Sequence, residues 1–306
     1  MVNTPEISVV ICTYNRQKFL PECLNCLSRQ TIRNELWEVI IVDNASTDQT
    51  AEIAKQWIAD NRERPFRYVL ESRKGLSFAR NRGIVEARSN VVTYIDDDAE
   101  TVPVFAEALN EFMKAHPEAA GAGGMVIPKY SESPEPAWMN PFLKGFVGLV
   151  DFGNKPKAYV KGMKYPIGCN MTYRKNLLLQ AGGFNNQLTF RGDDKYIFYA
   201  VTKINPLVYY VPKAKLYHNI DAGRLQHDYF KRLFLKTGNE EKIRVLAEQG
   251  KGGLVKKFLE YIFKFGASLF IWAGYRLKGK NAKGYYTMLS QWYTLQGFLK
   301  KSVFVR

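Results

Sequence analysis

Three consecutive aspartates, Asp96, Asp97 and Asp98, are the strongest chemical signal in the sequence. Adjacent carboxylates repel one another, so three of them at the end of a strand are costly without a cation. Residues two apart in a strand point to the same side, so Asp96 and Asp98 can face one space. Such oxygen ligands suit Mg²⁺ or Mn²⁺, which bind through one or two carboxylates plus substrate phosphates. A solvated acidic turn is the alternative, and it is disfavoured because the triplet ends a buried strand.

Alternating strands and helices must position the triplet. Short apolar runs predict buried strands, and helical patterns stand between them. The predicted strands are 7–12, 37–42, 66–70 and 91–95, the predicted helices are 19–29 and 46–59, and residues 75–87 are predicted to be a loop that leads into a helix. Ser46 with Gln49 three residues later is a capping-box pattern, so we expect the second helix to start there. This alternation predicts an α/β fold with a parallel sheet and right-handed crossovers.

Polar residues follow three of the predicted strands. Residues 13–16 follow the first strand, Asp43 follows the second, and the aspartate triplet follows the fourth. In open α/β sheets the ligand lies beyond the carboxyl ends of the strands. These residues therefore converge on one edge of the sheet, and we predict a ligand site there.

The rest of the chain predicts shorter elements and a change of character near residue 225. We expect helices at 104–115, 175–180 and 196–204, a glycine-rich strand or loop at 121–128, a Pro-rich loop at 131–141 and a strand at 207–211. Residues 1–225 are predicted to form the α/β domain. Residues 226–306 are predicted to form a basic, aromatic-rich helical region.

Several motifs together resemble family 2 glycosyltransferases with the GT-A fold. They are SVVICTYNR, VIIVDNASTDQT, GLSFARNRG, YIDDDAE, GCNMTYRK followed by GGF, RGDD, and a later His, spread over residues 7–220. The order and spacing of the motifs make the resemblance specific, although each alone would be weak. It implies a Rossmann-like, mostly parallel sheet flanked by helices, with a C-terminal helical extension. It also implies an inverting transferase that uses a UDP-linked sugar and a glycan or lipid-linked acceptor in cell-surface polysaccharide synthesis.

The resemblance assigns donor binding to residues at the strand ends and in the third helix. Asp43 would hydrogen-bond the base or the ribose, and Asp96 would be oriented toward the ribose. Thr13, Tyr14 and Asn15 would border the nucleoside, and Arg80 and Asn81 would help to shape the same pocket. Asp97 would either line the donor site or only be a neighbour of the two other aspartates.

The metal site is also implied by the resemblance. Asp98 would be the metal ligand of the D-x-D motif, and Mn²⁺ or Mg²⁺ would bridge the diphosphate and offset charge on the leaving nucleotide. His218, after the last predicted strand, is a candidate third ligand or diphosphate contact, with a structural or solvated His as the alternative. Two positions depart from the family: Ala99 stands where a further acid is common, and Cys12 where proline is common.

The resemblance also identifies residues on the acceptor side of the site. Asp193 and Asp194 match the acidic pair that, in the family, begins a helix beneath the acceptor. Asp194 would be the general base: a carboxylate against the acceptor hydroxyl can take its proton, and a single displacement inverts configuration. Helix capping is the alternative, particularly for Asp193. Asn170 and Trp138 are further candidate acceptor contacts. Trp138 could stack on a sugar, or its ring could only pin the loop to the core.

Positive charge is concentrated in the C-terminal region. The formal net charge is +15, and residues 251–306 hold eleven Lys or Arg against Glu260 alone, a net of +10. This basicity predicts an anionic partner, and the aromatic and aliphatic content favours a membrane over nucleic acid. The apolar run between Lys264 and Arg276 is shorter than the roughly 20 residues that span a bilayer, so we expect a helix in the membrane interface. A helical pair packed on the catalytic domain, or an oligomer contact, is the alternative.

Other features bear on location and on competing functions. Met1 to Glu6 is short and polar, which predicts no signal peptide and a cytoplasmic location, peripheral on the inner face of the cell membrane. A metal-dependent sugar-nucleotide nucleotidyltransferase is one alternative, but it would normally carry a Gly-rich loop with a basic residue where this chain has CTYNR. A non-catalytic nucleotide-sugar binding protein is another, and the D-x-D motif together with Asp194 disfavours it.

Overall fold

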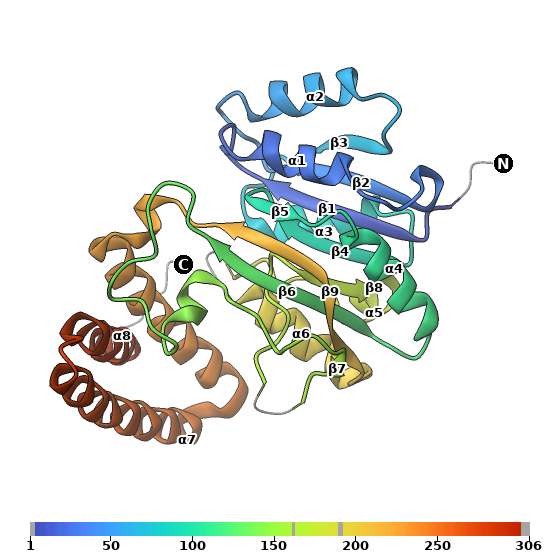
Figure 1. Ribbon diagram of the computed structural model, residues 1–306. Coiled ribbons are helices and arrows are strands. Elements are labelled where there is room, and N and C mark those ends of the chain that lie inside the picture. The colour runs from blue at the N-terminus through green and yellow to red at the C-terminus, as the bar shows by residue number, and fades with distance from the viewer. Residues whose placement is uncertain (1–3, 161–162, 189–191, 301–306) are drawn as a thin grey trace. The chain divides into compact units, whose positions relative to one another are not determined.

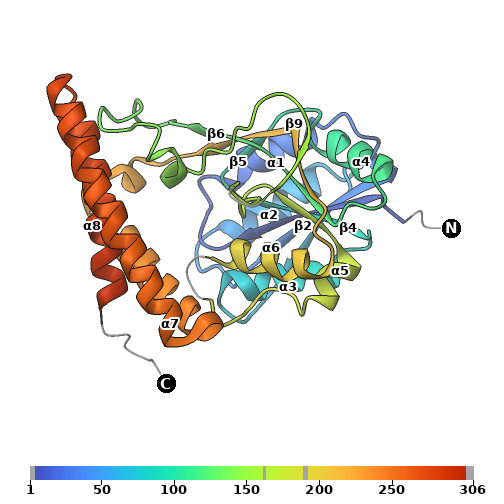
Figure 2. The same cartoon turned by 90° about the horizontal axis from the view of Figure 1, so that it is seen from below.

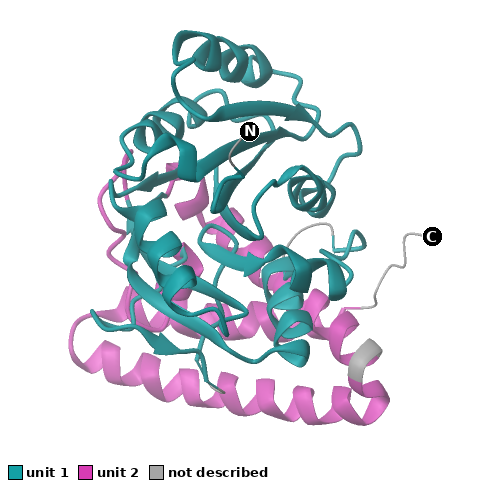
Figure 3. Cartoon of the chain, turned by 90° about the vertical axis from the view of Figure 1, so that its right-hand side faces the viewer, with its two compact units in different colours: residues 1–129, 148–219 teal, residues 130–147, 220–306 magenta. Residues whose placement is uncertain are grey.

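The computed structural model describes residues 4–160, 163–188 and 192–300, and the chain divides into two compact units (Figure 3). Unit 1 consists of residues 1–129 and 148–219, and unit 2 of residues 130–147 and 220–306. The chain therefore divides at 219/220, and the Pro-rich loop is grouped with the C-terminal helices. Arg191 of the RGDD motif and the last six residues of the basic tail lie outside the described residues.

Unit 1 is built on a nine-stranded sheet in the order β3-β2-β1-β4-β8-β6-β9-β5, with β7 paired to β9. Strands β3, β2, β1 and β4 pair in parallel, as the sequence predicts, whereas β8 runs antiparallel to both β4 and β6. The strands are β1 (Ile7–Thr13), β2 (Trp37–Asp43), β3 (Phe66–Leu70), β4 (Val91–Asp96), β5 (Ala99–Thr101), β6 (Gly121–Lys129), β7 (Lys157–Ala158), β8 (Met171–Arg174) and β9 (Val208–Asn219).

Helices cover both faces of this sheet (Figure 1). Helices α1, α2 and α4 lie over one face, and α3, α5 and α6 over the other. Their bounds are α1 (Leu20–Ser28), α2 (Thr50–Asp60), α3 (Leu76–Glu86), α4 (Phe105–Ala115), α5 (Lys175–Gln180) and α6 (Asp193–Ile204), with a short 3₁₀ turn η1 (Asn34–Leu36) before β2. Strand β2 is buried along its whole length, as expected for a strand covered on both faces. The α/β fold class is confirmed.

The start of α2 differs from the sequence prediction. The helix begins at Thr50, not at Ser46, so the predicted capping box was wrong. The Asp48 carboxylate accepts a hydrogen bond from the Thr50 amide at 3.0 Å and takes the local role expected of Ser46. The Ser46 hydroxyl instead accepts a hydrogen bond from the amide of Asn15 at 3.0 Å, which ties this loop to the loop after β1.

Strand β9 is much longer than the predicted strand 207–211, and the glycines of β6 explain why. A Cβ added at Gly124 would lie 1.7 Å from the carbonyl oxygen of Ala214, so only glycine allows this approach. The register of β6 and β9 shifts between Gly124 and Val126, which is a bulge. Beyond the bulge β9 continues to Asn219 and pairs with β5, which places His218 opposite Ala99.

Unit 2 is helical. It contains α7 (His227–Leu277), α8 (Asn281–Leu299) and the 3₁₀ turns η2 (Lys144–Val147) and η3 (Ala222–Leu225). Gly250 has a φ of 65° and breaks α7 into two helical segments, and Figure 2 shows α7 and α8 along their length. Among the residues that the structure describes, no helix combines the length and apolar character needed to cross a bilayer. An apolar cluster that includes Met139, Phe230 and Leu289 holds the Pro-rich segment against these helices.

Candidate functional site

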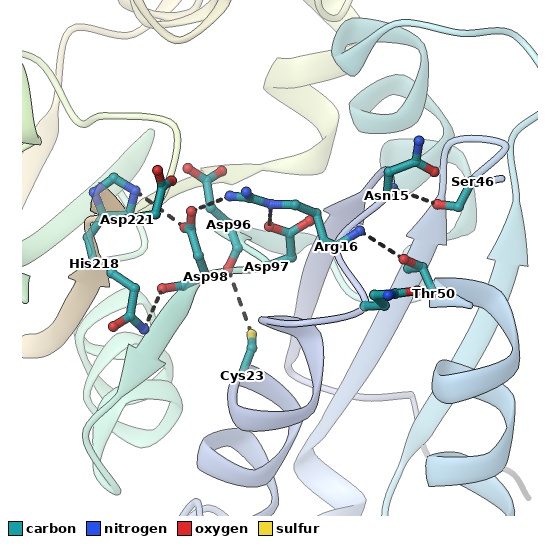
Figure 4. Close-up of polar contacts among 12 residues, drawn as sticks. Asn15, Arg16, Cys23, Ser46, Thr50, Asp96, Asp97, Asp98, His218 and Asp221 are labelled. Atoms are coloured by element: carbon teal, nitrogen blue, oxygen red, sulfur yellow. Dashed lines mark hydrogen bonds and ion pairs between the residues drawn. The ribbon is translucent and has the colours of Figure 1, made fainter. Parts of the chain in front are cut away.

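Two loops at the carboxyl edge of the sheet are joined by Asn15 (Figure 4). Asn15 has a φ of 54°, a left-handed conformation that asparagine tolerates better than most residues. Its side-chain oxygen accepts a hydrogen bond from the amide of Thr47 at 2.8 Å, and its own amide donates to Ser46. The amide of Arg16 donates to the hydroxyl of Thr50 at 2.8 Å. The segments after β1 and β2 therefore form one surface.

The acidic triplet meets His218 at this edge. Asp96 ends β4, and Asp97 and Asp98 form the turn into β5. One oxygen each of Asp96 and Asp98 and one ring nitrogen of His218 all lie within 4.8 Å of one another. The Nε2 atom of His218 is 3.3 Å from Oδ1 of Asp98, and both side chains are buried. The structure thus brings together the predicted metal ligand Asp98, the candidate ligand His218 and Asp96, the other acid of the D-x-D motif.

Arg16, which the sequence places at this edge without a role, pairs with the acidic triplet. Its Nε lies 2.9 Å from Oδ1 of Asp97, and its guanidinium also pairs with Asp98 (Figure 4). Burial and the adjacent Asp98 raise the pKa of Asp97 to about 6, although Arg16 acts in the opposite direction. Clustered carboxylates favour a nearby cation, so Arg16 in the CTYNR motif was one candidate, but its pairing with Asp97 and Asp98 depends on the fold.

Arg80 connects the triplet to the start of α6. The side chain is 3% exposed, pairs with Asp193 and lies 3.6 Å from Oδ1 of Asp96. Burial alone would lower the pKa of the Arg80 guanidinium, but the carboxylates of Asp193 and Asp96 outweigh burial and raise it. Arg80 is therefore a permanent positive charge between the two acidic groups, and its predicted part in shaping the donor pocket stays a prediction.

The two acids at the start of α6 have different surroundings. Asp193 is buried and pairs with Arg80, whereas the Asp194 carboxylate accepts hydrogen bonds from the amides of Lys195 at 2.7 Å and Gly168 at 3.2 Å. Burial and the charge of Asp193 raise the pKa of Asp194 above its usual value, and Arg80 opposes them. A carboxylate with a raised pKa is a better proton acceptor, which is compatible with the predicted role of Asp194 as general base; that role stays a prediction.

A pocket of about 320 Å³ adjoins the first two strands. Asn44 shapes its far wall: its side-chain amide donates to the carbonyl of Arg73 at 2.6 Å, and its oxygen accepts from the amide of Gly75 at 2.7 Å. Thr13 and Tyr14, which are predicted to border the nucleoside, are among the residues that line the pocket, while the remaining lining residues were not assigned to the donor site from the sequence. The pocket is lined by Cys12, Thr13, Tyr14, Asn44, Lys74, Gly75, Leu76 and Ala79.

Asp43 lies behind this lining. Its carboxylate is 1% exposed and accepts hydrogen bonds from the Tyr68 hydroxyl at 2.7 Å and the Ser46 amide at 3.0 Å. Asn44, the next residue in the chain, is the one that reaches the pocket wall. The predicted hydrogen bond from Asp43 to a base or ribose stays a prediction.

Three other predicted contacts have partners within the protein. Asn81 exchanges two hydrogen bonds with the backbone of Phe184, each 2.8 Å long. The amide of Asn170, which is buried, donates to the carbonyl of Ala214 at 2.9 Å. In unit 2, Trp138 stacks on Tyr286 with ring centres 4.6 Å apart. These contacts are structural, and a role for any of the three toward a ligand stays a prediction.

Comparison with known proteins relates this geometry to a family. The model of the family described as Glycosyl transferase family 2 matches residues 8–180. The glucosyl-dolichyl phosphate glucuronosyltransferase of Haloferax volcanii is 24% identical over 229 residues, covering 74% of this chain and 70% of that protein. The putative glycosyltransferase EpsH of Bacillus subtilis is 33% identical over 109 residues, but that match spans 35% of this chain and only 30% of EpsH.

Solved structures share the fold over nearly the whole chain. The mannosyltransferase PcManGT from Pyrobaculum calidifontis, in complex with GDP-Man and Mn²⁺, is similar with a TM-score of 0.60 and 18% identity, over 95% of this chain and 87% of that one. Residues 1–349 of S. aureus TarS, in complex with UDP, are similar with a TM-score of 0.56 and 17% identity, over 95% and 90% of the two chains. At these identities the likeness establishes the fold alone.

Proposed function

The chain belongs to Glycosyl transferase family 2, and on that premise we propose that it transfers a sugar from a nucleotide-diphosphate donor, UDP-linked, to a glycan or lipid-linked acceptor. The observation that carries the proposal is the gathering of Asp96, Asp98 and His218 within 4.8 Å at the carboxyl edge of the sheet. The pocket lined by Thr13 and Tyr14 is at the same edge and would take the nucleoside.

The donor set at the acidic triplet fits a divalent cation. Two carboxylates and one imidazole are ligands that Mn²⁺ accepts readily, and Mg²⁺ is compatible with the carboxylates. Asp98 and His218 would hold the ion, with Asp96 beside them. Bound there, the ion would neutralise the donor diphosphate and stabilise the leaving nucleotide. The presence of Mn²⁺ with GDP-Man in PcManGT, a protein of the same fold, supports this assignment.

Protein groups around the pocket would bind and orient the rest of the donor. Asn44 fixes the loop that carries Lys74 and Gly75, so this wall is preformed. The Lys74 ammonium lies 5.6 Å from the ring centre of Tyr14 at the pocket wall, where it would attract an anionic donor. Asp43 is retained as the proposed hydrogen-bond acceptor for the base or ribose.

Asp194 would act as the general base. As the acceptor hydroxyl attacks the anomeric carbon, its proton moves to the Asp194 carboxylate and the bond from that carbon to the diphosphate oxygen breaks. The nucleoside diphosphate leaves with the bonding electrons, and a single displacement inverts the configuration. Arg80 pairs with Asp193, and its positive charge opposes the rise in the pKa of Asp194.

The acceptor is proposed to belong to cell-surface polysaccharide synthesis at the inner face of the cell membrane. A lipid-linked acceptor would be presented at that surface. The C-terminal helical region, with its excess of basic residues, is proposed to contact the membrane.

A comparison of the wild type with Asp194→Asn tests the proposed chemistry. Nucleotide sugars would be screened with Mn²⁺ for thermal stabilisation and for release of nucleoside diphosphate. The same donor should stabilise both proteins, while turnover of Asp194→Asn should fall by about 10²–10⁴-fold. The exposed Asp60→Asn serves as the control and should behave as wild type. Near-normal turnover of Asp194→Asn would remove it as the base, and a screen in which no nucleotide sugar binds would contradict the proposed function.

A further inference from the structure

The second half of α7 carries an exposed row of apolar side chains, here called the α7 stripe. Phe263 is 75% exposed, Phe270 is 82% exposed and Leu277 is 90% exposed, values that are unusual for side chains of this size. The stripe consists of Val255, Leu259, Ile262, Phe263, Phe270 and Leu277, all exposed. Steps of three, four and seven residues place these side chains on one face of the helix. At 1.5 Å per residue the stripe is about 33 Å long.

The opposite face of α7 packs against α8. Tyr261 is 7% exposed, and its ring centre lies 5.2 Å from that of Phe298. Farther along, the ring centre of Phe265 lies 5.3 Å from that of Trp292. At 100° per residue Tyr261 and Phe265 point well away from the stripe. The contact with α8 therefore does not account for the stripe.

Positive side chains border the stripe on both edges. Lys256 and Lys264 are exposed on one edge, Lys251 and Arg276 are exposed on the other, and the exposed Lys278 directly follows the helix. The one acidic residue in this part of α7, Glu260, pairs with Lys264 and Lys257 and leaves the edge net positive. An apolar face between basic edges is the pattern of a helix that lies in a membrane interface.

We infer that the α7 stripe inserts into the interface of an anionic lipid bilayer, with α7 lying in the membrane plane. Aromatic and aliphatic side chains would enter the acyl boundary while the flanking lysines meet lipid phosphates. This inference rests on the proposed membrane contact of the C-terminal region, and it deepens that proposal by naming the surface and the charge of the lipid.

Charge and chemistry favour lipid over the other occupants of such a face. A second copy of this chain would bring two basic edges of the same sign together, which is unfavourable. A nucleic acid would satisfy the lysines but would leave Phe263, Phe270 and Leu277 without apolar partners. An anionic bilayer satisfies both requirements at once.

Flotation of the full-length protein with vesicles tests the inference, without any nucleotide sugar. Wild type should bind phosphatidylcholine vesicles that contain phosphatidylglycerol. The double variant Phe263→Ser, Phe270→Ser should lose more than about tenfold in partition coefficient, because two large apolar side chains no longer enter the interface. The triple variant Lys256→Gln, Lys264→Gln, Lys278→Gln should lose roughly fivefold per lysine on vesicles with phosphatidylglycerol, and little on phosphatidylcholine alone.

Phe142→Ser is the matched control, since Phe142 is 62% exposed but lies in the segment 130–147 and not on α7. It should bind as wild type, and far-UV circular dichroism should show that all variants fold. Unchanged vesicle binding by the double phenylalanine variant would overturn the inference. A second outcome would also overturn the inference: the wild type binds no vesicles but forms a dimer, and the double phenylalanine variant abolishes that dimer. A second copy of the chain would then cover the α7 stripe. The rise in unfolding temperature on adding a soluble nucleotide sugar should be the same for all these variants. A failure of the membrane inference can therefore be told apart from a failure of the proposed sugar transfer.

Discussion

Arg16 places a positive charge among the acidic side chains that are proposed to bind a metal ion (Figure 4). It pairs with both Asp97 and Asp98, and its guanidinium carbon lies 4.7 Å from the ring centre of Phe19. The two aspartates have different partners: Asp97 pairs with Arg16, while Asp98 contacts both Arg16 and His218. A metal ion at Asp98 would share that carboxylate with Arg16 or displace it.

Replacing Arg16 should therefore have opposite effects without and with a metal ion. In the absence of metal, Arg16→Gln should lower the free energy of unfolding by about 1–3 kcal/mol, because buried carboxylates lose their counter-charge. Mn²⁺ should raise the unfolding temperature of Arg16→Gln more than that of wild type, since Asp98 no longer shares its charge with a guanidinium. Thermal unfolding with and without Mn²⁺ measures both effects.

Arg33→Gln provides a matched control, because the Arg33 side chain is 72% exposed and pairs with the exposed Glu35, away from the acidic triplet. It should leave both measurements unchanged. An Arg16→Gln protein as stable as wild type without metal would show that Arg16 does not hold the triplet together.

Strand β2 depends on a buried charge at the opposite end from the site. The Glu38 side chain is fully buried and accepts hydrogen bonds from the Ser8 hydroxyl at 2.6 Å and from the Arg88 backbone amide at 2.7 Å. Its second oxygen accepts from Arg88 Nε at 2.8 Å and Arg67 Nε at 3.2 Å. Both carboxylate oxygens are therefore satisfied, and the network joins β1, β2, β3 and the end of α3.

This network makes stability depend on pH in a defined direction. Burial alone would raise the pKa of Glu38, but the bonds from Ser8, Arg88 and Arg67 outweigh it and hold the pKa below its ordinary 4.5. A lowered pKa in the folded state stabilises the protein above the unfolded-state value, and this contribution is lost as pH falls through the folded-state pKa. Glu38→Gln should cost about 2–4 kcal/mol at neutral pH.

Urea unfolding as a function of pH measures this effect. The difference between wild type and Glu38→Gln should be largest at neutral pH and should narrow as pH falls below 4.5. Glu63→Gln is the control, because the Glu63 side chain is 68% exposed. A difference that stays constant from neutral to acid pH would mean that the charge of Glu38 is not what stabilises the strand.

At the scale of the whole molecule, the segment 130–147 is grouped with unit 2 although it interrupts unit 1 in the sequence (Figure 3). Trp138 explains much of this grouping, since its ring stacks on Tyr286 and meets Phe230 edge-on at 5.6 Å. Asn140 adds polar contacts, donating to the carbonyl of Lys283 at 2.8 Å and the hydroxyl of Thr287 at 3.0 Å. Unit 2 thus depends on residues more than a hundred positions apart.

Trp138→Ala separates the two roles that the sequence left open for this residue. If the ring is a structural anchor, the variant should lose about 3–5 kcal/mol of unfolding free energy, because large aromatic contacts and a cavity are involved. Donor-dependent thermal stabilisation should remain. Phe142→Ala, whose ring is 62% exposed, should be close to neutral. A Trp138→Ala protein of normal stability but with impaired transfer would instead favour stacking on a sugar.

Family membership also decides among the functions that the sequence left open. The chain is a glycosyltransferase, so the nucleotidyltransferase and the non-catalytic binding protein are set aside. The donor sugar, the acceptor and the use of a metal remain proposals that the experiments above address.

The sequence alone determined the local features of this protein. Strands such as β1 were predicted because a continuous apolar run requires burial on both faces, and the parallel pairing of the first four strands follows from alternating strands and helices. Asp96, Asp98 and His218 were identified from motifs that are short and continuous in the chain. These inferences use patterns within short segments together with the order and spacing of those segments along the chain.

The tertiary structure decided what depends on contacts between distant segments. The length of β9 follows from the approach of Gly124 to Ala214, and the pairing of Arg16 with the triplet spans more than eighty positions. The start of α2 moved to Thr50 because Ser46 is used by Asn15. Side-chain partners of this kind are set by the packing of the whole fold, and no local pattern of residues encodes them.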